Sequence, residues 1–370
     1  MNRILVSLLV SLVIAACVQP LRAQSPAVRQ ATLLWQVDGS ESGDPFGRLG
    51  DYLLLKDGTL WALDFKDQII RRYDARGKAL PSVGRKGSGP GEMRNANGLA
   101  LAPDGSIWVN DPANSRFAVF ASDGKAVRSI TVPFKGYMYR WGAWFDHSGE
   151  LVEVDLGKES RYRRLDNNGK LLGTIPFPNC PGRSDGTSTP TTITAGTRGE
   201  APSYFASYPF SRGMFPAADR RGHFWCASSR GTRVARIAYG KADTIARTSF
   251  DIPLIPVQKA ERDEAIQSIE KNLTKYQIND FNALNVPSSK SGIFEVYVDD
   301  NGRLWVAHTA PWKEQRTTYD VFDGAGKALF RVTLPVRAVL TLPVVSRGDE
   351  FVVATMDEDD VVRLSRYRLR

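Results

Sequence analysis

The sequence has few of the residues that build soft-metal sites. Its 370 residues contain three cysteines and three histidines, against eight tryptophans. Structural zinc and iron–sulfur centres take about four Cys or His ligands each, so we predict no metal-binding residues and can name no cofactor. A Gly-x-Ser-x-Gly nucleophile elbow is missing, and the Gly-rich stretch 87–91 lacks the strand-to-helix context of a nucleotide loop. The sequence therefore carries no recognisable catalytic motif.

Long apolar runs are also missing, except at the N-terminus. Arg3 precedes an uncharged apolar run over residues 4–14, which is too short to span a bilayer and is typical of a secretory signal. We expect residues 1–23 to be removed on export. The alternative is a lipid anchor at Cys17, because residues 14–17 resemble a bacterial lipobox. We predict a periplasmic or extracellular protein without a transmembrane segment.

Charge of one sign is not concentrated anywhere in the chain. Lysine and arginine exceed aspartate and glutamate by 49 to 40, but the basic residues are dispersed, so we expect a solvated surface and no nucleic-acid partner. Export would also permit a disulfide between Cys180 and Cys226. Since Cys226 falls in a predicted strand and Cys180 in a loop, we expect two separate thiols.

What the sequence does have is a repeat with two markers. A turn glycine followed at once by an apolar strand recurs at Gly58, Gly105, Gly149, Gly222, Gly302 and Gly348. A second marker, the dipeptide Gly-Lys, begins at Gly77, Gly124, Gly169, Gly240 and Gly326. The two markers stay in step from one copy to the next, and most copies are about 45 residues long. This indicates a repeat architecture.

Each repeat contains four alternating β runs joined by tight turns. The clearest copy has them at 99–102, 107–110, 116–121 and 126–132. Six such units predict an all-β fold over residues 31–370, a six-bladed β-propeller of four-stranded antiparallel blades. The sixth copy ends one strand short, and the alternating segment Ala31–Val37 is otherwise unassigned. We expect this N-terminal strand to close the ring and so remove an open edge.

The second repeat resembles the NHL-repeat family of six-bladed propellers, which includes bacterial exported proteins. The matching residues are Gly87-Ser88-Gly89-Pro90-Gly91-Glu92-Met93, Gly98 to Gly105, and Asn114-Ser115-Arg116-Phe117. The rhythm of blades extends over 51–370. The resemblance implies a fold and a binding face, but propellers carry many unrelated functions.

Two repeats are longer than the others. Gly149 to Gly222 and Gly222 to Gly302 span 73 and 80 residues, which places insertions at about 178–205 and 252–291. Both fall in links from an outer strand to the next inner strand, on the face that we call the top. The first insertion is rich in Thr, Gly, Ser and Pro and predicts an irregular loop. The second predicts an amphipathic helix over 257–276. We expect the helix to pack on the propeller and to cover the top face over blades three to five.

A ring of residues is expected where the second strands reach the top face. Its members lie six residues beyond each turn glycine, or seven in the last blade: Asp64, Asp111, Asp155, Ser228, His308 and Thr355. We expect the acids to fix loops through ion pairs with arginines that begin the third strands, at Arg116, Arg161 and Arg233. His308 breaks the pattern and has no matching arginine. His147 and His223 flank turn glycines on the opposite face, so the three histidines cannot share a metal.

Cations recur near the start of the inner strands, where the central channel would open. They are Arg48, Arg140, Arg212 and Arg337, and Tyr139 lies beside one of them. We predict that Arg140 and Arg212 hold a small anionic ligand or glycan, with Arg48 and Arg337 opposite. A structure in which Arg140 and Arg212 point away from the channel, or are tied to acids with no room beside them, would leave only a generic interaction surface.

The function that these features predict is an exported binding or interaction module. Its top face would take an anionic or sugar-like ligand or a protein partner. The alternative is a propeller enzyme, a lyase or hydrolase with or without a metal, using the same channel mouth with His308 as acid or base. Ionisable side chains gathered about one point would favour the enzyme, and dispersed arginines without an acid would favour binding.

Overall fold

The computed structural model describes residues 26–132, 140–155, 161–178, 180, 192–195, 204–210, 216–227, 233–241, 244–249, 252–275 and 281–370. Its sheets form the six predicted blades. Blade 1 contains β3 (Leu49–Leu54), β4 (Leu60–Asp64), β5 (Ile69–Tyr73) and β6 (Ala79–Val83). Blade 2 contains β7 (Leu99–Leu101), β8 (Ile107–Asp111), β9 (Arg116–Phe120) and β10 (Ala126–Thr131). Blade 3 contains β11 (Trp144–Phe145), β12 (Leu151–Asp155), β13 (Arg161–Leu165) and β14 (Leu171–Pro176). Blade 4 contains β17 (Pro216–Asp219), β18 (His223–Ala227), β19 (Arg233–Ala238) and β20 (Thr244–Ser249).

The last two blades complete the ring. Blade 5 contains β23 (Ile293–Val298), β24 (Leu304–His308), β25 (Thr317–Phe322) and β26 (Ala328–Leu334). Blade 6 contains β27 (Arg337–Ala338), β28 (Val345–Arg347), β29 (Glu350–Met356) and β30 (Val362–Leu369). Two short 3₁₀ turns, η1 (Ser40–Ser42) and η2 (Pro112–Asn114), lie in the connections. The predicted architecture is confirmed.

Tight turns explain why the repeat begins where it does. Gly58 and Gly105 have φ of 88° and 86°, in the left-handed region that favours glycine, and every other glycine of both markers also has positive φ. The outer hairpins are closed by an aspartate as well: Asp74 accepts the backbone N–H groups of Arg76 and Lys78. These local bonds fix each hairpin without help from distant residues.

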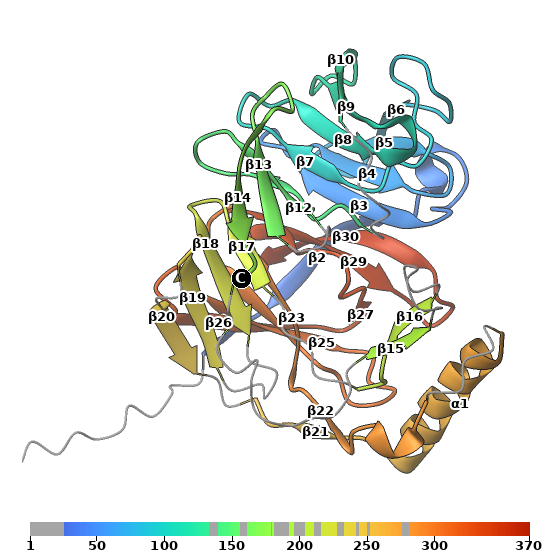
Figure 1. Ribbon diagram of the computed structural model, residues 1–370, viewed down its shortest axis with the longest axis vertical. Coiled ribbons are helices and arrows are strands. Elements are labelled where there is room, and N and C mark those ends of the chain that lie inside the picture. Colours follow the sequence, from blue (N-terminus) through green and yellow to red (C-terminus); the bar gives the residue numbers. More distant parts are fainter. Residues whose placement is uncertain are drawn as a thin grey trace, which may run out of the picture.

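The ring is closed by the N-terminal strand, as predicted. Strand β2 (Ala31–Val37) pairs antiparallel with β30, with Ala31 opposite Leu369 and Val37 opposite Leu364. Figure 1 shows the blue β2 beside the red β30. The short β1 (Ala27–Arg29) was not predicted. It pairs parallel with β26, so the chain first joins blade 5 and then blade 6.

Apolar side chains fill the space between neighbouring blades. Each of six buried clusters joins one blade to the next, including the pair formed by blades 6 and 1. The repeated tryptophans Trp61, Trp108, Trp225 and Trp305 are at most 1% exposed and belong to four of these clusters. Burying a large tryptophan ring at four of the six interfaces between blades stabilises the ring.

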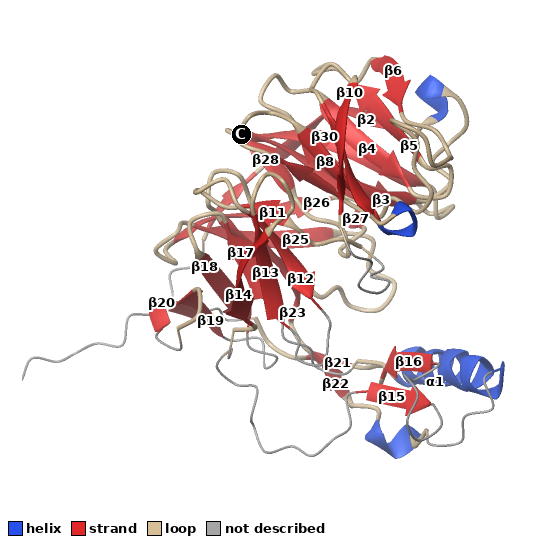
Figure 2. Ribbon diagram, turned by 45° about the horizontal axis from the view of Figure 1, so that its top comes forward, coloured by secondary structure: helices blue, strands red, loops and turns tan. Residues whose placement is uncertain are grey.

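The two insertions form a satellite beside the blades. The first contains the hairpin β15 (Thr192–Ala195) and β16 (Tyr204–Ser207), where we expected an irregular loop. The second contains β21 (Ile255–Pro256), α1 (Lys259–Lys275), η3 (Ala283–Asn285) and β22 (Ser289–Lys290). In Figure 2, β15, β16 and α1 lie together, joined to the blades through β21 and β22.

Helix α1 packs on the satellite, and our expectation that it packs on the propeller was wrong. Its residues Ile266, Ile269 and Leu273 join a cluster with Tyr208 and Val286. The cluster mixes residues from both insertions, so each insertion supplies the apolar surface that the other lacks. The end of α1 nearest the blades is fixed by Glu261, whose carboxylate accepts Lys290 Nζ at 2.5 Å.

The cysteines form a bond that we did not expect. Cys180 and Cys226 are joined by a disulfide, with their Cα atoms 5.5 Å apart. The bond ties the link after blade 3 to β18 of blade 4, and both sulfurs lie in the cluster between these blades. The preference for two separate thiols was therefore wrong.

No helix in the described part of the chain is both long and apolar enough to cross a bilayer.

Candidate functional site

Charged side chains meet at the centre of the propeller, where the inner strands begin. We call Asp51, Tyr52, Arg140, Glu295 and Tyr297 the axial cluster; they come from the entrances of blades 1, 3 and 5. Arg140 precedes the inner strand of blade 3 and reaches Asp51 of blade 1, where its Nε and Nη2 donate to Oδ1 at 3.1 and 2.9 Å. The ion pair therefore joins blades 1 and 3, which are not adjacent in the ring.

Asp51 is held in place by backbone as well as by Arg140. It is 1% exposed, its Oδ1 accepts the N–H of Tyr52 at 3.0 Å, and its Oδ2 accepts the N–H of Leu99 at 3.0 Å. A β-bulge between Leu49 and Asp51 turns the strand at this point. Because both oxygens are satisfied, Asp51 serves to position Arg140, whose side chain stays 32% exposed.

Glu295 occupies the same place in blade 5 as Asp51 does in blade 1. Each acid follows a bulge in the inner strand and lies opposite the penultimate residue of the second strand, Leu63 or Ala307. Each also accepts the N–H of the next residue, which for Glu295 is Val296 at 3.0 Å. Burial raises the pKa of Glu295 to about 7, and the nearby charge of Arg140 opposes this only in part.

The two tyrosines of the cluster anchor blade 6. Its innermost segment is interrupted, since β27 and β28 both pair with β29 and residues 339–344 run between them. The hydroxyl of Tyr52 donates to the carbonyl of Pro343, and that of Tyr297 donates to the carbonyl of Leu340. Burial raises the pKa of both phenols, so they stay protonated donors at neutral pH.

The other predicted binding residues are not gathered with Arg140. The guanidinium of Arg48 lies over the ring of Phe65, 4.5 Å from its centroid. Arg337 is about half exposed and lies 3.5 Å from an oxygen of Asp360. The predicted Arg212 and Tyr139 lie outside the described residues. The ligand-binding role of all five residues stays a prediction.

The acids of the top ring are structural, as expected. Asp64 pairs with Arg71 at 3.2 Å, Asp111 with Arg116 at 3.5 Å, and Asp155 with Arg161 at 3.5 Å. Asp111 also accepts the N–H groups of residues 94 and 95, which belong to the link that enters blade 2. These contacts fix the top loops. Ser228, a further expected member of the ring, lies outside the described residues.

His308 contacts an acid, Asp320, and not an arginine of the kind that pairs with the acids of the ring. Its Nε2 lies 3.0 Å from Oδ2 of Asp320, and Arg331 donates to both oxygens of the same carboxylate at 2.6 and 2.8 Å. Burial acts to raise the pKa of Asp320, but hydrogen bonds from Arg331 and His308 outweigh it and lower that pKa. The arginine comes from the fourth strand, so a search at the start of the third strand missed it.

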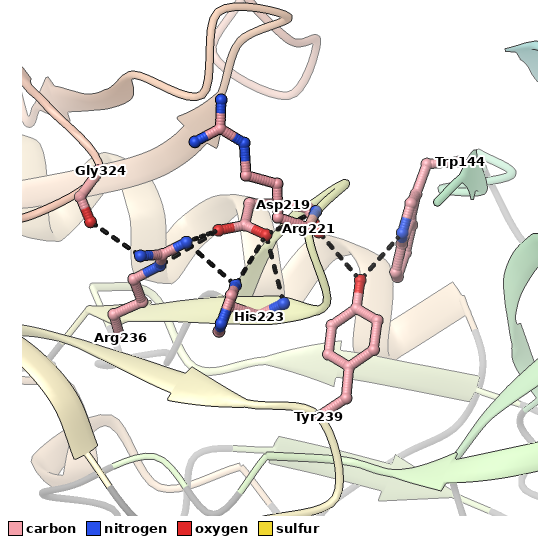
Figure 3. Close-up of polar contacts among 7 residues, drawn as sticks. All are labelled: Trp144, Asp219, Arg221, His223, Arg236, Tyr239 and Gly324. Carbon is pink, nitrogen blue, oxygen red and sulfur yellow. Dashed lines mark hydrogen bonds and ion pairs between the residues drawn. The ribbon is translucent and has the colours of Figure 1, made fainter. Parts of the chain in front are cut away.

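A second histidine belongs to a network on the opposite face. Figure 3 shows Asp219 accepting hydrogen bonds from Arg236 and contacting His223, while Arg236 also donates to the carbonyl of Gly324. Tyr239 donates to the backbone carbonyl of Asp219 and accepts from Trp144 Nε1. The network joins blades 3, 4 and 5, which is a structural role.

Sequence reasoning missed Asp51 and Glu295, because it looked for acids only where the second strands reach the top face and for cations near the start of the inner strands. A signal was present, since each acid is the third residue of a largely apolar inner strand and is followed by a tyrosine one or two residues later. Within the described ranges, no three His, Cys, Asp or Glu side chains gather in a way that could hold a metal ion.

Comparisons with known proteins agree with the fold. No protein-family model matches the chain, and no curated protein matches it in sequence. Among solved structures it is similar to a member of the DUF4221 family from Bacteroides vulgatus, 9% identical over 93% of this chain and 97% of that one, with a TM-score of 0.50. It is also similar to the WD40 repeats of RRP9, at 12% identity, 94% and 99% coverage and a TM-score of 0.52. Virginiamycin B lyase from Staphylococcus aureus matches at 13% identity, 92% and 100% coverage and a TM-score of 0.48. Identities this low show the fold alone.

Proposed function

We propose that this protein is an exported binding module that takes a small anionic or sugar-like ligand where its inner strands begin. The observation that carries the proposal is the state of Arg140. Asp51 orients its guanidinium, the side chain remains 32% exposed, and its Nη1 makes no hydrogen bond within the described part of the chain. A donor that is already oriented loses little entropy when it binds a carboxylate, phosphate or sugar hydroxyl.

The balance of charge favours a small ligand over a polyanion. Asp51 compensates the charge of Arg140, and Glu295 adds a further carboxyl nearby. The axial cluster therefore offers directed hydrogen bonds but no strong positive field, and we propose no nucleic-acid partner. A protein partner at the top face remains the second form of this proposal, because the satellite projects from the links on that face (Figure 2).

Two features support export. The apolar run behind Arg3 resembles a secretory signal, with cleavage after residue 23 or lipid attachment at Cys17 as its two outcomes. The Cys180–Cys226 disulfide suits an oxidising compartment. The NHL-like second repeat fits the same proposal, since that family includes exported bacterial propellers.

The test is calorimetric titration with neutral sugars, sugar acids and sugar phosphates. We expect at least one class to bind, and Arg140→Gln to weaken that binding by at least about tenfold, the loss typical of a charge-assisted hydrogen bond. Arg85→Gln, which removes a largely exposed arginine, is the matched control and should bind as the wild type does. Thermal melts establish that both variants are folded. The proposal fails if no class binds, or if both variants bind equally.

The alternative is an enzyme at the same face, and it is favoured both by the His308–Asp320 contact and by the acids gathered beside Arg140 in the axial cluster. A carboxylate that holds Nε2 orients the imidazole and leaves Nδ1 to exchange a proton. Mass spectrometry of the recovered ligand after each titration separates the two functions. An unchanged ligand supports binding, and a cleaved or eliminated product supports the enzyme.

A further inference from the structure

Asp51 and Glu295 occupy equivalent places but have different partners. The carboxylate oxygens of Asp51 accept hydrogen bonds from two backbone N–H groups and from the guanidinium of Arg140. Glu295 accepts one backbone N–H group on its Oε1. Within the described residues, no donor makes a hydrogen bond to its Oε2, and no cation forms an ion pair with its carboxylate. Blade 5 thus repeats the acid of blade 1 without repeating its cation.

A partly buried carboxylate without a cation is unfavourable, because water is removed and no opposite charge replaces it. The charge of Arg140 reaches Glu295 but does not cancel this cost, so burial still raises the pKa of Glu295 to about 7. The acid is therefore divided between its protonated and ionised forms near neutrality. A cation brought by a ligand would complete the arrangement that Arg140 completes for Asp51.

Among the described residues, the centre of the propeller consequently presents two groups of opposite kind that have an atom without a hydrogen-bond partner in the protein. Arg140 offers Nη1 as a donor on the side of blade 3, and Glu295 offers Oε2 as an acceptor on the side of blade 5. We infer that the ligand is zwitterionic, with a carboxylate bound by Arg140 and a primary ammonium group bound by Glu295. The inference rests on the proposed binding function of the same cluster and names its ligand class, of which free amino acids are the simplest members.

Binding should then depend on pH. Among the described residues, the ionisable groups that interact with Glu295 are Arg140, which is paired with Asp51, and the phenol of Tyr297, which in turn interacts with that of Tyr52. Both phenols stay protonated near neutrality because burial raises their pKa. Only ionised Glu295 attracts an ammonium group, so affinity should rise as pH increases through 7. Between pH 6 and pH 8 the ionised fraction of a group with that pKa grows about tenfold.

The experiment compares three matched series of probes by calorimetry: the free amino acids, their N-acetyl derivatives and their amides. Acetylation removes the ammonium charge, and amidation removes the carboxylate. We expect a free amino acid to bind the wild type at least about tenfold more tightly than either derivative, and about tenfold more tightly at pH 8 than at pH 6. Glu295→Gln should remove both the preference over the N-acetyl derivative and the pH dependence. Glu314→Gln, which changes a partly exposed acid paired with Arg316, should behave as the wild type.

The possible failures are distinguishable. The inference is overturned if the N-acetyl derivatives bind as tightly as the free amino acids, if Glu295→Gln binds as the wild type does, or if no amino acid binds. The proposed function survives any of these results when a sugar, sugar acid or sugar phosphate still binds in a manner that requires Arg140. If neither panel binds, both proposals are wrong.

Discussion

At the scale of single residues, the buried charged groups are of two kinds, those with an ion-pair partner and those without one. Some form ion pairs that fix loops or join blades, as Asp111 does with Arg116. Glu295 is the exception in the axial cluster, since it has one backbone donor and no ion pair among the described residues. A group of that kind costs stability when it ionises, and it is therefore a candidate for function.

Replacing Glu295 should make the protein less sensitive to pH. The folded protein holds this proton up to about pH 7, while the ordinary value is 4.5, so the folded state binds more protons between these values. Stability contributed by the protonated group is complete below 4.5 and is lost as pH rises through 7. We expect Glu295→Gln to be close to wild type at pH 5 and more stable by up to about 3 kcal/mol at pH 8.

Urea unfolding of both proteins at the two pH values measures this difference. Glu314→Gln is the control, because that carboxylate is held ionised by Arg316 at the surface and should give the same difference at both pH values. If wild type and Glu295→Gln lose stability equally between pH 5 and pH 8, the carboxyl is not protonated in the folded protein as the structure indicates.

At the scale of elements, the N-terminal segment contributes two strands of unequal weight. Strand β2 pairs along its whole length with β30, buries Val37 and sets Trp35 against blade 1, where its Nε1 donates to the carbonyl of Ala75. Strand β1 makes three parallel pairings, and Val28 within it is 71% exposed. Closure of the ring should therefore depend on β2 and little on β1.

Deleting residues 26–37 should destabilise the protein by at least about 3 kcal/mol, because it opens the edge of β30 and uncovers the cluster between blades 6 and 1. Deleting residues 26–29 alone should change the free energy of unfolding by less than about 1 kcal/mol. Chemical unfolding followed by tryptophan fluorescence compares the two with the wild type. Equal stability of the two deletions would show that β2 does not close the ring in solution.

At the scale of the whole molecule, the disulfide links the fold to the compartment. Cys180 and Cys226 are 46 residues apart, and the bond holds the first insertion against blade 4. A crosslink over a loop of that length stabilises by about 4 kcal/mol in the chain-entropy description, mainly by restricting the unfolded chain. The protein should therefore be less stable in a reducing compartment.

Thermal melts with and without reductant test this. We expect the reductant to lower the melting temperature of the wild type by on the order of 10 °C, from about 4 kcal/mol at roughly 2–4 °C per kcal/mol. The double variant Cys180→Ser, Cys226→Ser should melt near the reduced wild type and should not respond to reductant. A wild type that melts at the same temperature in both conditions would mean that the bond is not formed or adds no stability.

The amino-acid sequence by itself determined the number of blades, their strands and the closure of the ring. The reason is that these features depend on repeated local signals: a glycine that accepts positive φ and alternation along the strands in all six blades, and a tryptophan at one strand position in four of them. Strand β1 escaped this reasoning, because three residues carry no periodicity.

Tertiary structure alone decided where charges and insertions meet. Asp51, Arg140 and Glu295 are far apart in the chain and come together only because blades 1, 3 and 5 face one axis, so spacing could suggest Arg140 but not its partner. The same holds for the satellite in which two insertions share one cluster, and for the disulfide. Each is a contact between segments whose separation follows no repeat, and its energy depends on a position in space that the ring must first create.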